Sequence, residues 1–78
     1  MRELKYIIFE DNSFILFDTC QKHSEACMRS DIKSAGFCSI TFYNDEVTIT
    51  CYGESISLKK KSNENDSRII RVWLTGEF

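Results

Sequence analysis

Residues 37–52 read FCSITFYNDEVTITCY, in which apolar and hydroxyl-bearing side chains alternate on both sides of Asn44-Asp45. Alternation with a period of two is typical of half-buried strands, and two such residues between the strands favour a tight hairpin turn. A two-residue turn fixes every pair in the two strands. One face then carries Phe42 with Val47, Ile40 with Ile49 and Cys38 with Cys51, and the other carries Thr41 with Thr48, Ser39 with Thr50 and Phe37 with Tyr52.

The size of the chain limits what this hairpin can join. With 78 residues, of which 42% are hydrophobic, we expect one folded domain spanning 1–78. A domain this small buries only about 60% of the surface of its unfolded chain. We therefore expect a homo-oligomer, in which a second copy covers remaining apolar surface.

The first third of the chain predicts two strands and a helix. Residues 4–18, LKYIIFEDNSFILFD, read as two strands around the turn residues 11–13. Both runs are apolar on both faces, so helices or another subunit should cover each side. Residues 18–32 resemble a short helix, capped by Asp18 or Thr19, with a start at Ser24 as the alternative.

The last third predicts a second helix. Its apolar residues fall at helical spacing: Ile69, Ile70, Trp73 and Leu74. Ser62 or Asn65 is a suitable N-cap, and Gly76 is a suitable stop. A closing strand over 68–74 is the rival. The fold class that follows is α+β, a small antiparallel sheet of about four strands with one or two short helices, in the order ββαββα.

The hairpin pattern breaks at residues 53–55, where the parity of the apolar residues changes. An extra residue at a glycine predicts a β-bulge at Gly53. Gly36 would lie opposite Gly53, and two facing glycines allow another backbone or a ligand to approach closely.

Four cysteines occupy positions 20, 27, 38 and 51, without a C-x-x-C spacing. We therefore expect no metal site and no cofactor. Nothing resembles a signal peptide or a membrane span, which favours reduced thiols in a cytoplasm. Packing of Cys38 against Cys51 in the core is the first interpretation, and a redox-sensitive bridge between them is the alternative. Ten basic against twelve acidic residues disfavour binding to long nucleic acid.

Several segments form a distinctive set: KYIIF (5–9), SAGFCSI (34–40), CYGESISL (51–58), a following KKS and a terminal helix, with His23 in front of the first helix. Together they resemble a family of short uncharacterised phage and prophage proteins. Residues 59–68, KKKSNENDSR, depart from the tighter approach to the terminal helix in that family. The resemblance implies a viral or mobile-element origin, and hence the cytoplasm of a host cell.

The candidate site combines an aromatic and hydroxyl-bearing strand face with a basic segment. Its predicted ligand-binding residues are Phe37, Ser39, Tyr52, Gly53, Glu54, Ser55, Lys60, Lys61 and Arg68, with His23 as a polar contact. Aromatic rings stack bases and basic residues attract phosphates.

We therefore expect a non-catalytic phage-like binding protein that counteracts a host antiviral defence. It would sequester a cyclic or modified nucleotide signal or block a host defence protein. One alternative is a small cysteine-dependent or nucleotide-cleaving enzyme, in which His23 and Glu54 would activate a thiolate. Another is a regulatory or structural phage protein whose edge strand pairs with a partner.

Overall fold

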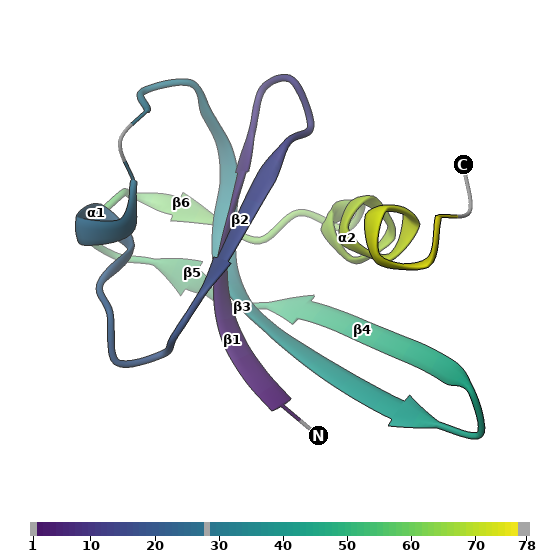
Figure 1. Ribbon diagram of the computed structural model, residues 1–78. Helices are drawn as coiled ribbons and strands as arrows, with labels where there is room; N and C mark the ends of the chain where they lie inside the picture. The colour runs from purple at the N-terminus through teal and green to yellow at the C-terminus, as the bar shows by residue number, and fades with distance from the viewer. Residues whose placement is uncertain (1, 28, 77–78) are drawn as a thin grey trace.

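The computed structural model describes residues 2–27 and 29–76, and it has the predicted α+β fold (Figure 1). The main sheet is antiparallel with strand order β2-β1-β3-β4, formed by β1 (Arg2–Phe9), β2 (Phe14–Phe17), β3 (Ile32–Tyr43) and β4 (Glu46–Tyr52). A second sheet pairs β5 (Glu54–Ser55) with β6 (Lys60–Lys61). The helices are α1 (His23–Ala26) and α2 (Asp66–Thr75). The two short strands of the second sheet are additions to the predicted order.

The predicted hairpin is confirmed at every pair. Cys38 lies opposite Cys51, and the register continues without a shift from Phe37 with Tyr52 to Tyr43 with Glu46. Asn44 and Asp45 have φ of 49° and 65°, the left-handed values that a tight type I′ turn requires. The twist of this turn matches that of the strands, so the local sequence alone sets the register.

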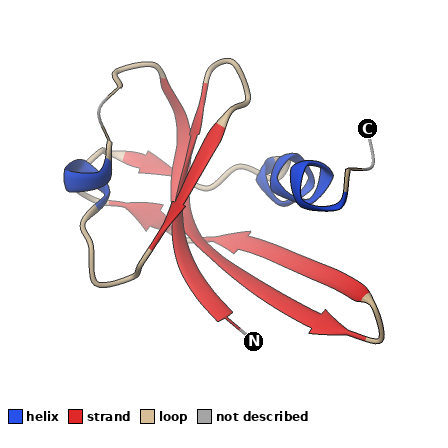
Figure 2. Cartoon of the chain, in the orientation of Figure 1, coloured by secondary structure: helices blue, strands red, loops and turns tan. Residues whose placement is uncertain are grey.

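The main sheet is covered on both faces, as the strands apolar on both sides predicted (Figure 2). One face packs against α2 and buries Tyr6, Ile8, Cys38, Ile40, Ile49 and Ile70. On the other face Ile7, Phe9 and Ala35 form a smaller cluster with partly buried residues such as Phe17 and Leu58. Figure 1 shows α1 and the second sheet on this side, opposite α2.

The terminal helix is confirmed, and the rival strand over 68–74 is wrong. Gly76 has φ of 72° and donates its N–H to the Val72 carbonyl, so it ends α2 as predicted. Asn65 lies at the N-cap as predicted, but its side chain makes no capping hydrogen bond, and the alternative cap Ser62 is wrong because it lies before the first turn. Asn63, two residues earlier, stabilises this end of the helix: its Oδ1 accepts the Asn65 N–H at 3.2 Å in an Asx turn, and its own N–H donates to Asp66 Oδ2 at 2.8 Å.

Asp66 anchors α2 to the sheet. Its side chain is fully buried and also accepts hydrogen bonds from Tyr6 Oη at 2.5 Å and from Ser34 Oγ at 2.9 Å. Burial, and then the hydrogen bond to Asp66, raises the pKa of Tyr6 far above its usual value. Strands β1 and β3 and the start of α2 are therefore joined through one carboxylate.

The first predicted helix is much shorter than 18–32. Among the described residues of this segment, only His23–Ala26 is helical, and Lys22 at its N-cap makes no side-chain hydrogen bond. Asp18 does not cap it, because its Oδ1 accepts the Cys20 N–H in a separate turn. The apolar residues of this segment are too sparse to bury a longer helix face, so tertiary contacts decide its structure.

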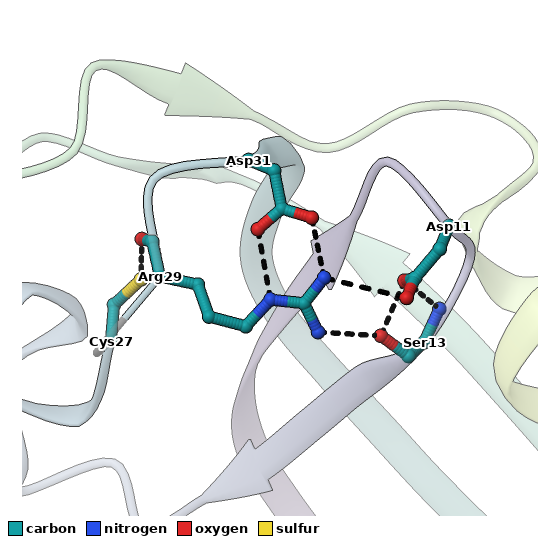
Figure 3. A network of polar contacts seen from close by, with 5 residues as sticks. All are labelled: Asp11, Ser13, Cys27, Arg29 and Asp31. Atoms are coloured by element: carbon teal, nitrogen blue, oxygen red, sulfur yellow. Dashed lines mark hydrogen bonds and ion pairs between the residues drawn. The ribbon is translucent and has the colours of Figure 1, made fainter.

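Arg29 holds the loop that replaces the rest of that helix (Figure 3). Its guanidinium pairs with Asp31 and Asp11, donates to Ser13 Oγ at 3.1 Å and lies 4.0 Å from the centre of the Phe9 ring. Hydrogen bonds from Ser13, with a smaller contribution from Arg29, lower the pKa of Asp11 to about 2. One side chain thus ties the β1–β2 turn to the approach to β3.

The irregularity after β4 is a strand break, so the predicted bulge is wrong. Gly53 has φ of 77°, and the chain leaves the main sheet there to enter the second one. The close approach of the two glycines is confirmed, because a Cβ at Gly36 would lie only 2.6 Å from the Tyr52 carbonyl oxygen. The backbone of this chain itself fills the space that the glycines leave.

Candidate functional site

The predicted aromatic residues lie together on the α1 side of the main sheet. Phe37 and Tyr52 stack with ring centroids 5.9 Å apart and planes 20° apart. Ser39 follows on the same face, opposite Thr50. The rings therefore stack on each other across the strands, which leaves less of their faces for a ligand.

His23 is a buried anchor on the same side. Its Nε2–H donates to the Gly36 carbonyl at 2.8 Å, and its ring meets Phe17 and Phe37 edge-on. Burial lowers its pKa, and the nearby charge of Lys5 acts in the same direction. The neutral ring thus closes α1 onto the sheet.

A small hollow opens beside these rings, which we call the α1 hollow. It has a volume of about 240 Å³ and is lined by Lys5, Lys22, His23, Phe37, Glu54, Ile56 and Ser57. Lys5 Nζ already donates to the Gln21 carbonyl at 2.8 Å. This volume is below the roughly 300–1,000 Å³ of most small-molecule pockets.

The remaining predicted site residues are divided between the two sides of the sheet. Glu54 pairs with Lys61 and Ser55 with Lys60 in the second sheet. Ser55 is buried, and its Oγ accepts the Leu58 N–H, so its role is to hold a turn. Arg68 lies on α2, across the main sheet, and the structure does not bring it to the stacked rings.

The residues considered for thiol catalysis are also divided. Cys38 and Cys51 belong to the α2 face, whereas His23 belongs to the α1 face. Burial raises the pKa of Cys38 to about 12, which leaves almost no thiolate near neutral pH. Within residues 2–27 and 29–76, no three His, Cys, Asp or Glu side chains gather in a way that could hold a metal ion.

A larger hollow lies between the β1–β2 turn and α2, and we call it the Trp73 hollow. Its volume is about 380 Å³, and it is lined by Asn12, Lys33, Asn65, Arg68, Ile69, Val72 and Trp73. Trp73 is 59% exposed and meets Phe14 edge-on at 6.4 Å. Lys33 Nζ donates to Asn12 Oδ1 at 3.1 Å.

The lining of the Trp73 hollow combines two cations, two side-chain amides and an indole, and none of the lining residues that the structure describes is acidic. Only Arg68 among them was predicted as a ligand contact. The sequence identifies Trp73 as an apolar helix residue and Asn12 as a turn residue, and it does not mark either of them, or Lys33, as a ligand contact. The exposure of the indole points to this hollow, but only the structure reveals it.

A third opening, the β4–α2 cleft, has a volume of about 650 Å³. Its lining contains three carboxylates and two guanidinium groups: Asp45, Glu46, Val47, Thr48, Ile49, Glu64, Ser67, Arg68 and Arg71. It is bounded on one side by the backbone of an edge strand, which distinguishes it from the two hollows.

Comparison with known proteins gives no template for any of these openings. No family model matches the chain, and no curated protein or solved structure matches it either. Neither helix of the described residues has the length and apolar character needed to cross a membrane.

Proposed function

We propose that this chain is a non-catalytic binding protein that sequesters a nucleotide immune signal of a host antiviral defence, with the Trp73 hollow as its pocket. The observation that carries the proposal is the meeting of Trp73, Lys33 and Arg68 around a hollow whose lining, within residues 2–27 and 29–76, contains no carboxylate. The phage-protein resemblance supplies the defence context.

The chemistry of a nucleotide matches this lining. A planar base stacks on an exposed aromatic ring for about 1–3 kcal/mol, and Trp73 offers that ring. Phosphates form charge-assisted hydrogen bonds with lysine and arginine, here Lys33 and Arg68. The amides of Asn12 and Asn65 can each donate to and accept from base edges.

Binding is favoured over catalysis by the separation of the reactive groups. The imidazole of His23 and the thiol of Cys38 face opposite sides of the sheet, and neither residue lines the Trp73 hollow. A ligand held there would meet cations, amides and apolar groups. Such a protein acts stoichiometrically, by lowering the free concentration of its ligand.

The single tryptophan of the chain makes the test direct, because any fluorescence change from tryptophan reports on this hollow. A panel of mononucleotides, cyclic dinucleotides and cyclic trinucleotides is titrated into the purified protein. We expect one class to give a saturable change. Substitutions Lys33→Ala and Arg68→Ala should each weaken its binding by about tenfold or more.

Lys60→Ala and Lys61→Ala are the matched controls, since they remove the same kind of charge from the second sheet. They should leave the affinity unchanged. A flat response to the whole panel would reject nucleotide sequestration and favour blocking of a host protein. Disappearance of the nucleotide with sub-stoichiometric protein would instead establish an enzyme.

A further inference from the structure

Strand β4 is one edge of the main sheet, and part of that edge is open. The amide of Cys51 points away from β3, because its N–H donates to Ser67 Oγ on α2 at 2.9 Å. Outward-pointing amides recur at every second residue of an antiparallel strand, so those of Val47 and Ile49 point the same way. No hydrogen bond within residues 2–27 and 29–76 satisfies these two amides.

The β4–α2 cleft runs along this open segment. Val47, Thr48 and Ile49 line it from the strand, and Ser67 and Arg71 are among the residues that line it from the helix. An unpaired strand edge recruits another strand unless it is blocked. Here neither a proline nor a lysine lies on β4, so its sequence does not prevent pairing.

We propose that the occupant of this edge is β4 of a second copy of the chain, paired antiparallel about a two-fold axis at Thr48. Since α2 already uses the Cys51 amide, only Val47 and Ile49 remain to pair on each copy. A two-fold arrangement then places Val47 opposite Ile49 of the partner subunit, and Thr48 opposite itself.

Apolar surface on the α2 face supports this pairing. Phe42 is 72% exposed, and its cross-strand neighbour is Val47. In the dimer, the row of Phe42 and Val47 continues into Ile49 and Ile40 of the partner subunit. A small domain thus extends an apolar row that it cannot complete alone.

Charge complementarity supports the same geometry. Antiparallel pairing brings the hairpin tip of one copy, with Asp45 and Glu46, beside the start of α2 of the other. The residues of α2 that line the cleft include Arg68 and Arg71. The contact between an acidic tip and a guanidinium group therefore occurs twice in the dimer, once on each side of the axis.

Charges introduced at Thr48, which is exposed, test the axis. Sedimentation equilibrium of the full chain should show a dimer. Thr48→Lys and Thr48→Glu should each raise the dimer Kd about fivefold, because like charges then face each other. An equimolar mixture of the two variants should dimerise more tightly than either alone.

Two further variants fix the register. Thr50→Lys should tighten the dimer, because residue 50 would face Glu46 of the partner subunit. Thr41→Lys, on β3 and away from the edge, should leave it unchanged. A protein that stays monomeric at several hundred micromolar overturns the proposal. A dimer whose Kd changes equally in all of these charged variants, or in none of them, also overturns the proposal.

Discussion

Asp66 and His23 are buried polar anchors on opposite faces of the same sheet. Asp66 accepts hydrogen bonds from Tyr6, Ser34 and the Asn63 backbone, and it fixes the start of a ten-residue helix. Among the described residues, the side chain of His23 makes one hydrogen bond, to the Gly36 carbonyl, and it fixes a four-residue helix. The longer helix α2 is thus joined to the sheet by more polar contacts than the shorter helix α1. This difference predicts unequal effects of the two anchors on stability.

The largest effect is expected from Asp66→Ala. It removes the acceptor of three donors, two of them on the buried Tyr6 and Ser34 side chains, and each unsatisfied buried donor costs about 1–3 kcal/mol. We expect the free energy of unfolding, measured with urea, to fall by about 3–5 kcal/mol. That is a large part of the stability of a domain this small.

Two further variants make this prediction decisive. Tyr6→Phe removes only one donor and should cost about 1–2 kcal/mol, so it remains measurable if Asp66→Ala does not fold. Asp45→Asn, in the exposed hairpin turn, should change stability by less than about 0.5 kcal/mol, because asparagine also tolerates the left-handed φ of 65° at this position. Equal losses for the two aspartates would show that Asp66 is not an anchor.

An intermediate effect is expected from titration of His23, the only histidine in the chain. Burial lowers its pKa below 6.5 in the folded state, so the unfolded state takes up the proton first as the pH falls. The contribution of the neutral ring to the free energy of unfolding should therefore be fully present above pH 6.5 and should decrease below it. Thermal melts between about pH 7.5 and 5.5 should show a falling melting temperature.

His23→Gln provides the control, because glutamine keeps a donor for the Gly36 carbonyl but does not titrate in this range. Its melting temperature should be lower at pH 7.5 and nearly independent of pH down to 5.5. Carboxylates with lowered pKa, such as Asp11, add their own dependence only at lower pH. A wild-type protein whose melting temperature is flat over this range would contradict the prediction.

The same contrast explains what the sequence could predict. The β3–β4 hairpin and α2 have strong local periodicity, a specific turn and a glycine stop, so their type and most of their limits follow from neighbouring residues. Helix α1 and the second sheet are too short to show any period. They depend on His23 and on contacts with the main sheet, which local patterns do not encode.

The candidate pocket was harder to predict because it is assembled from distant segments. Asn12 comes from a turn, Lys33 from β3 and Trp73 from α2. Each has an ordinary local role, as a turn, strand or helix residue. Arg68 was identified as a phosphate contact, but it was grouped with aromatic rings that the sheet places on the other side. Only the tertiary arrangement identifies its neighbours.

The smallest effect is expected from mild oxidation of Cys38 and Cys51. They lie directly opposite each other in a pair without mutual backbone hydrogen bonds, where about 4.5 Å between Cα atoms is within disulfide reach. Burial raises the pKa of both thiols, that of Cys38 to about 12, so little thiolate is present to react.

At pH 7, oxidised glutathione should therefore form this bridge only slowly. Intact mass measures it, since closing the bridge removes two hydrogens, and Cys51→Ser is the control because it cannot lose them at this pair. Rapid loss of two hydrogens from the wild-type chain alone would show that the α2 face opens readily, and that the two faces differ less than their anchors suggest.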